Sequence, residues 1–221
     1  MSESVPRQTL KRFIWVVAFG IGFAYVEAAV VVYLREIFYP QGFTFPLPNL
    51  LAEYRGMRLY ATEVGRELAT MVILITSSAL IGTNFRTRLA YFLTIFAVWD
   101  IFYYVWLKVL LNWPATLMDW DILFLIPLPW AGPVLAPVLI SLLMLVIAGA
   151  LLYRDSPRQT LRISPLYISI IVALCIFVID LFCRAGLHIV DPDYASYFNW
   201  PAFLASMFAV IVLFVYCYFK K

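Results

Sequence analysis

Residues 97–137 read AVWDIFYYVWLKVLLNWPATLMDWDILFLIPLPWAGPVLAP, and this stretch decides the fold. It holds Asp100 within an apolar segment, then Lys108, and then an uncharged run that several prolines interrupt. A charged side chain deep in a membrane is costly, so an ionisable residue there indicates either a function or an ion pair. The stretch predicts a membrane-spanning helix followed by a segment that its prolines prevent from forming one continuous helix.

The composition of the whole chain agrees with a membrane protein. Of its 221 residues, 64% are hydrophobic and 13% are charged, and the mean hydropathy is +0.91. Soluble domains carry about 25% charged residues. The net charge of +3 is too small to indicate a nucleic-acid-binding surface. The single histidine excludes a His-rich metal site, and the three cysteines lack the C-x-x-C spacing of a redox or zinc motif.

Six segments are long and apolar enough to span a bilayer, which takes about 20 residues each. We therefore predict an all-α fold, a bundle of six transmembrane helices in a single transmembrane domain over residues 1–221, with a short cytoplasmic tail over 1–12. The first segment is too long for a signal peptide and no cleavage site follows it, so we expect it to remain as an anchor. The predicted helices cover residues 13–34, 59–82, 89–111, 133–153, 163–183 and 201–219.

The distribution of Lys and Arg predicts the orientation, because cytoplasmic loops carry an excess of them. With both termini inside, the inner side collects ten basic residues: Arg7, Lys11, Arg12, Arg86, Arg88, Arg154, Arg158, Arg162, Lys220 and Lys221. The outer side then holds four: Arg35, Arg55, Arg58 and Arg184. We expect a bacterial cytoplasmic (inner) membrane, with both termini cytoplasmic.

Two long connections lie on the predicted outer side. Residues 35–58 are rich in proline and aromatic residues and predict an irregular lid, whose end at 50–58 is amphipathic enough for a short surface helix. Residues 122–133 are uncharged but contain three prolines, which predicts a re-entrant or interfacial segment. The alternative is an early, kinked start of the fourth helix.

On this topology the charged residues of the helices all fall between the bilayer centre and the outer surface. They are Glu27, Glu63, Arg66, Glu67, Asp100, Lys108 and Asp180. Glu63 and Glu67 are four residues apart and share a helix face, and Arg66 is close enough to neutralise one of them. These positions predict a polar chamber that opens to the outer side.

Three chemistries suit such a chamber. Buried carboxylic acids keep a proton and act as general acids, and aromatic walls of Trp99, Tyr103, Tyr104 and Trp106 could stabilise a carbocation. The same acids could instead hold a hard cation such as Mg²⁺, or form a proton or ion pathway. Our leading hypothesis is an enzyme that acts on a membrane-soluble lipid or isoprenoid by acid–base chemistry, without an identified cofactor or metal. Its catalytic acids are Glu27, Glu63, Glu67 and Asp100, with Arg66, Trp99, Tyr103 and Tyr104 binding the substrate.

Structural explanations compete with these roles. Glu63 and Glu67 would form an ion-paired cluster with Arg66. Asp100 would pair with a Lys or Arg, or accept hydrogen bonds from Ser or Tyr. Glu27 has no partner within its own helix, so it must find one elsewhere or be protonated. The remaining polar residues read as interfacial or solvated side chains: Lys108, Asp119, Asp121, Asp180, Arg184 and His188.

The chain is similar in type to small membrane-embedded terpenoid and carotenoid cyclases, in size, helix count and scattered acids, a similarity that assigns no residue a role. Two other functions stay open. One is a transporter or ion pathway, which the proline-broken stretch alone supports. The other is a non-catalytic subunit of a larger membrane complex or a homo-oligomer. The partners expected in every case are membrane lipids, and none is a nucleic acid.

Overall fold

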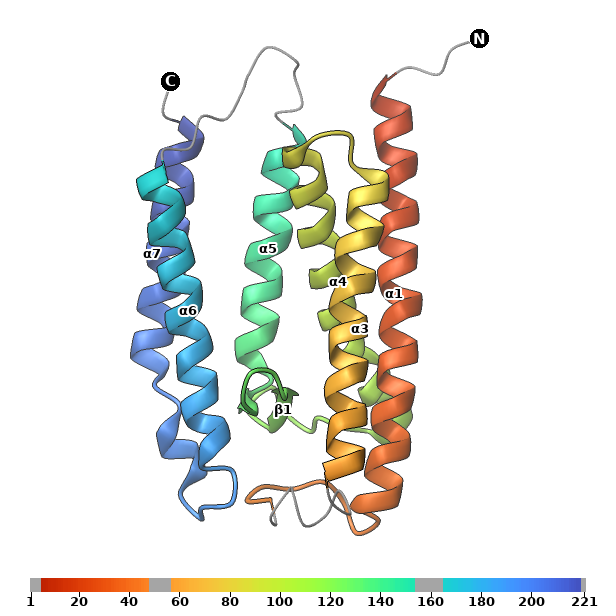
Figure 1. Cartoon of the computed structure of the whole chain (residues 1–221), viewed down its shortest axis with the longest axis vertical. Coiled ribbons are helices and arrows are strands. Elements are labelled where there is room, and N and C mark those ends of the chain that lie inside the picture. The colour runs from red at the N-terminus through yellow and green to blue at the C-terminus, as the bar shows by residue number, and fades with distance from the viewer. Residues whose placement is uncertain (1–4, 48–56, 154–164, 220–221) are drawn as a thin grey trace. The chain divides into compact units, whose positions relative to one another are not determined.

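The computed structural model describes residues 5–47, 57–153 and 165–219 (Figure 1). Long helices make up most of these ranges, and a β-hairpin lies between two of them. In chain order, the elements are α1 (Val5–Phe38), α3 (Met57–Ile81), α4 (Phe85–Leu111), β1 (Trp120–Phe124), β2 (Trp130–Pro133), α5 (Leu135–Tyr153), α6 (Pro165–Leu187), a short 3-10 helix η1 (Tyr194–Tyr197) and α7 (Trp200–Phe219).

Within these described ranges, six helices are long and apolar enough to cross a membrane, as predicted. The chain is a multi-pass integral membrane protein. Most helix ends lie within four residues of those predicted, but α1 begins at Val5, eight residues before the predicted start. Helix α4 begins four residues before the predicted Leu89, because Asn84 and Thr87 form a reciprocal capping box. At its other end Asn112 is left-handed, and Lys108 Nζ donates to the carbonyl oxygen of Pro114 at 2.9 Å.

The chain divides into two compact units, which are described separately. The first contains residues 1–43, 68–119 and 134–155, and the second contains 44–67, 120–133 and 156–221. Helix α3 changes unit between Glu67 and Leu68. The organisation as a single transmembrane domain stays a prediction.

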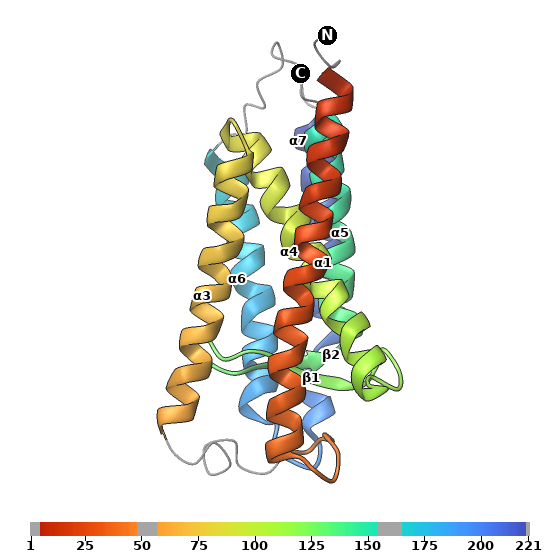
Figure 2. The same ribbon diagram turned by 90° about the vertical axis from the view of Figure 1, so that its right-hand side faces the viewer.

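In the first unit, α1 and α5 both pack along α4 (Figures 1 and 2). The contact between α1 and α4 is close because small residues face it: Ala24 and Ala28 on α1 are fully buried, and so is Ala97 on α4. A Cβ on Gly20 would lie only 2.9 Å from Val98 Cγ1. Lipid tails are as apolar as the side chains of a neighbouring helix, so apolar burial alone does little to bring two membrane helices together. Helix packing in membranes therefore relies on small residues that let the two backbones approach closely.

In the second unit, α6 packs against α7 and against the hairpin of β1 and β2. Two glycines permit the second contact. A Cβ on Gly186 of α6 would overlap the carbonyl oxygen of Pro129, and one on Gly132 would lie 2.9 Å from Phe182 Cε1. The Phe182 ring is central to an aromatic cluster that also contains Trp130, Phe198 and Phe203.

The proline-broken segment after α4 is an antiparallel β-hairpin. Pro127 and Pro129 lie in its turn and Pro133 ends β2, positions at which the missing N–H of proline is tolerated. The prediction that the prolines exclude a continuous helix is confirmed, but the strands were not anticipated. The alternative of an early start of the fourth helix is wrong, because α5 begins at Leu135. The re-entrant or interfacial position of the segment stays a prediction. The predicted surface helix at 50–58 lies, apart from its last two residues, outside the described residues.

Candidate functional site

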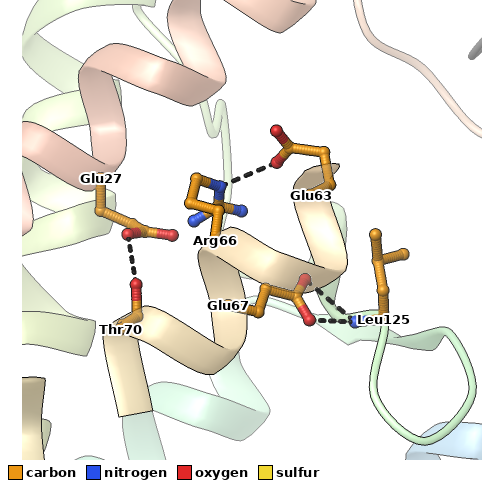
Figure 3. Close-up of polar contacts among 6 residues, drawn as sticks. All are labelled: Glu27, Glu63, Arg66, Glu67, Thr70 and Leu125. Atoms are coloured by element: carbon orange, nitrogen blue, oxygen red, sulfur yellow. Dashed lines mark hydrogen bonds and ion pairs between the residues drawn. The ribbon is translucent and has the colours of Figure 1, made fainter. Parts of the chain in front are cut away.

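One face of α3 carries the densest group of polar residues. Glu63, Glu67 and Thr70 are all buried, at helical spacings of four and three residues. Arg66, on the adjacent face, donates from Nε to Glu63 Oε2 at 2.8 Å (Figure 3). The predicted neutralisation of one carboxylate by Arg66 is confirmed. An ion pair of this kind, largely removed from solvent, holds both side chains in one geometry because separating them would leave a buried charge.

Glu67 binds the hairpin rather than another charged side chain. Both of its carboxylate oxygens accept the backbone N–H of Leu125, at 3.0 and 2.8 Å (Figure 3). The hydroxyl of Tyr60, two turns earlier on α3, lies 3.5 Å from the carbonyl oxygen of the same Leu125. The backbone N–H and the carbonyl oxygen of Leu125, the residue that follows β1, therefore both bond to side chains of α3 within the second unit. These contacts of Glu67 and Tyr60 with Leu125 hold the hairpin against α3 and are called the clamp below.

Glu27, near the middle of α1, is only 8% exposed and accepts a hydrogen bond from Thr70 Oγ1 at 3.2 Å (Figure 3). The expectation that Glu27 must find a partner outside its own helix is confirmed. Thr70 belongs to the part of α3 that lies in the first unit. The contact joins a carboxyl group to a neutral hydroxyl inside the membrane-spanning part of the protein.

Asp100 makes a second carboxyl–hydroxyl pair in the first unit. The hydroxyl of Ser141 on α5, itself buried, donates to Asp100 Oδ2 at 2.8 Å. Two structural partners were expected for Asp100, a basic residue or a hydroxyl, and the hydroxyl of a serine is present. The hydroxyls that bond to Glu27 and Asp100 lie on different helices, α3 and α5. A common chamber for the four acids, predicted from the sequence, stays a prediction.

The aromatic residues proposed to line the substrate site lie on α4, in the first unit. Trp99 and Tyr104 are buried and Tyr103 is half-buried. Trp99 packs on Phe96 with ring centroids 5.4 Å apart, and Tyr103 meets Tyr104 edge to face at 5.0 Å. These contacts are those of a packed aromatic interior. A role in substrate binding stays a prediction.

Several polar residues outside this group have structural roles. Asp180 pairs with Arg184 one helical turn away, Nε to Oδ2 at 2.7 Å, and both side chains are well exposed. Asp119 accepts from the backbone N–H of Ala115 and from the hydroxyl of Thr116, which stabilises the turn before β1. The prediction that Asp121 is a solvated loop acid is wrong, since it is 2% exposed. It lies in β1, and strand pairing with β2 brings it into the interior.

Arg35 is a residue whose position the sequence analysis missed. It was counted as an outer-loop charge, yet it is 6% exposed and its guanidinium lies between two rings. The distances from Cζ to the ring centroids are 4.0 Å for Phe43 and 3.8 Å for Trp113. Such stacking stabilises a guanidinium by cation–π attraction. The aromatic richness of residues 39–45 was a signal that a cation could be held there.

The carboxylates do not gather into a metal site in the part of the chain that the structure describes, where no three His, Cys, Asp or Glu side chains come close enough to hold an ion. The first unit contains two carboxyl–hydroxyl pairs, and the second contains an ion pair and a carboxylate that accepts a backbone amide. No protein family, curated protein or solved structure proved significantly similar to this chain. Its function is therefore argued from these contacts.

Proposed function

We propose that the protein acts on a membrane-soluble lipid or isoprenoid by acid–base chemistry. The observation that carries the proposal is the pairing of two acids with neutral hydroxyls, the buried Glu27 with Thr70 and the half-buried Asp100 with Ser141. A hydroxyl stabilises either protonation state of a carboxyl group, because it donates to the carboxylate and accepts from the acid. Such a pair can hold a proton within a medium of low dielectric constant and deliver it to a bound molecule.

The contacts support a division of roles among the remaining residues. Within the second unit, Arg66, oriented by Glu63, would bind an anionic group, and Glu67 would hold the hairpin in position through Leu125. Trp99, Tyr103 and Tyr104 would provide aromatic surface for an apolar chain or for positive charge that develops during the reaction. In this proposal Glu27 and Asp100 are the proton donors.

The proposal includes an orientation: both termini in the cytoplasm of a bacterium, and the acids in the outer half of the bilayer. Its support is the excess of basic residues on one side, ten against four. Labelling single cysteines with a membrane-impermeant maleimide tests it on intact cells. A cysteine in the hairpin turn should react from outside and one in the 82–84 turn should not. The reverse pattern would invert the topology.

The test of function begins with the protein extracted in its native lipids. Its co-purified lipids are identified by mass spectrometry, and a total lipid extract is then incubated with wild type, Glu27→Gln and Asp100→Asn. We expect wild type to convert one lipid species, and each variant to do so about 10²–10⁴-fold more slowly, the usual contribution of a general acid. The matched control is Asp180→Asn. The carboxylate that it removes is exposed and pairs with Arg184 on the same helix, α6. This variant should retain full activity.

A second role is favoured by a specific observation: several acids join separate elements. Glu27 bonds α1 to α3, Asp100 bonds α4 to α5, and Glu67 bonds α3 to the hairpin. A non-catalytic subunit that uses its acids only to hold its helices would have this pattern. In that case no lipid is converted by wild type, and each substitution lowers the melting temperature. A turnover loss in variants that keep the wild-type melting temperature contradicts the structural role.

A further inference from the structure

His188 is the chain's single histidine and starts the connection between α6 and α7, in the second unit. Its Nδ1 lies 2.8 Å from Asp191 Oδ2. An ionised carboxylate only accepts hydrogen bonds, so in the neutral ring Nδ1 carries the proton and donates it. The partner on one nitrogen thereby selects the tautomer in which Nε2 keeps its lone pair.

The ring is held by its face as well as by this nitrogen. His188 stacks on Tyr197 with centroids 3.7 Å apart and an angle of 3° between the ring planes. Successive backbone turns fix the connection, with the N–H of Asp191 bonded to the carbonyl oxygen of His188 at 3.0 Å. The carbonyl of the next residue, Ile189, accepts the N–H of Leu47 at 2.8 Å. In many proton-transfer sites, the orientation of the base is fixed by a hydrogen bond to another group, as Asp191 fixes His188 here.

The imidazole remains accessible despite these contacts. Its side chain is 40% exposed. Among the residues that the structure describes, no hydrogen bond of Nε2 to another protein group is found. The nitrogen that Asp191 leaves with a lone pair is thus the one available to a ligand.

The surroundings decide which ligand suits it. Asp191 and Asp193 both act electrostatically on Tyr197, the ring against which His188 stacks. The nearest basic residue in sequence, Arg184, is bonded to Asp180. Leu47, which bonds to Ile189, and residues 44–46 before it carry no charge. Within the described connection between α6 and α7, Asp191 and Asp193 are the charged side chains, and their negative charge disfavours phosphates and carboxylates and favours neutral hydrogen-bond donors.

We propose that His188 and Asp191 form a proton-accepting site for a hydroxyl of a neutral, sugar-like headgroup. The O–H of the headgroup donates to Nε2. The connection contains the tyrosines of η1 and leads to Trp200 at the start of α7, and such amphipathic rings are typical of headgroup depth. None of these residues belongs to the acid–base site proposed above, so either proposal can fail alone.

The single histidine makes the test unambiguous, since ¹⁵N-labelled histidine gives one pair of ring signals in a protein purified by a histidine-free tag. The protein is placed in nanodiscs of phosphatidylcholine, with or without monoglucosyl diacylglycerol. We expect the proton on Nδ1, and an Nε2 signal that moves with the mole fraction of the glucolipid. Asp191→Asn should shift the tautomer equilibrium and weaken the response. Asp193→Asn, which removes the same charge but no bond to the ring, should keep both.

Three results would overturn the proposal: a proton on Nε2 in the wild-type tautomer, an Nε2 signal unchanged by the glucolipid, or an equal response in Asp191→Asn. Nanodiscs with phosphatidylglycerol provide the remaining comparison, because its headgroup also bears hydroxyls but is anionic. We expect no shift there. A larger shift with phosphatidylglycerol than with the glucolipid would contradict the neutral-ligand assignment. Tyr197→Phe retains a ring for stacking and should behave as wild type.

Discussion

The clamp between Glu67 and the hairpin gives the most decisive prediction. In Glu67→Gln one oxygen can still accept the N–H of Leu125, but the charge and the second acceptor are lost. A hydrogen bond to a charged group contributes about 1.5–3 kcal/mol and a neutral one about 0.5–1.5 kcal/mol. The difference predicts that the substitution destabilises the hairpin by about 1–2 kcal/mol.

The measurement is hydrogen–deuterium exchange by mass spectrometry on the protein in nanodiscs. A local loss of about 1–2 kcal/mol corresponds to a 5–30-fold increase in the population of the open form. We therefore expect exchange of the amides of residues 120–133 to rise by that factor in Glu67→Gln. Amides of α1 and α4 belong to the other unit and should exchange as in wild type.

The matched control is Glu63→Gln, one helical turn away on the same face. Its carboxylate is bonded to Arg66 and not to the hairpin. It should therefore leave exchange of residues 120–133 unchanged. Equal protection of the hairpin in wild type and Glu67→Gln would refute the clamp, and so would equal loss of protection in the two variants.

Three further experiments test other contacts, each by thermal unfolding of the protein in detergent. Gly186→Ala should lower the melting temperature, because its Cβ would overlap a backbone oxygen that cannot rotate away, whereas Gly149→Ala, with no atom within 4 Å, should not. Arg35→Met keeps the apolar length of the side chain but loses the cation–π attraction, and should cost about 1–2 kcal/mol. A double-mutant cycle of Glu27→Met and Thr70→Val, each of which removes one partner of the hydrogen bond, should give a coupling of about 0.6 kcal/mol, the average measured within one helical membrane protein. Additive effects would show that the hydrogen bond contributes nothing.

The helices could be predicted because their signal is local. Twenty apolar residues in a row have few structural alternatives in a membrane, so composition alone located α5 and α7 to within two residues at each end. The partners of isolated acids were also partly predictable. A carboxyl group such as that of Glu27, with no neighbour in its own helix, must bond to another element if it is buried, and Thr70 meets that requirement.

The hairpin could not be predicted from the sequence, because its two strands are recognised by their pairing with each other and not by a local pattern of residues. Ile122 pairs with Ala131 across a turn that two prolines occupy, and neither strand has a regular alternation of polar and apolar residues. The burial of Asp121 follows from that pairing and was missed with it. Arg35 was misjudged for a different reason. Counting charges treats every arginine near a helix end as solvated, and the count contains no information about the rings of Phe43 and Trp113, which come from separate parts of the chain.

The polar face of α3 also bears on how the protein is made. Only one narrow row of its described side chains is buried: Glu63, Glu67, Thr70, Leu74 and Ser78. Most of the side chains in that row are polar, and Glu67 and Thr70 depend on partners outside α3. Thr70 bonds to a helix made earlier, but Glu67 requires Leu125, which leaves the ribosome more than fifty residues later. The polar row of α3 therefore acquires its partners in two steps, and the second step follows only after the hairpin has been translated.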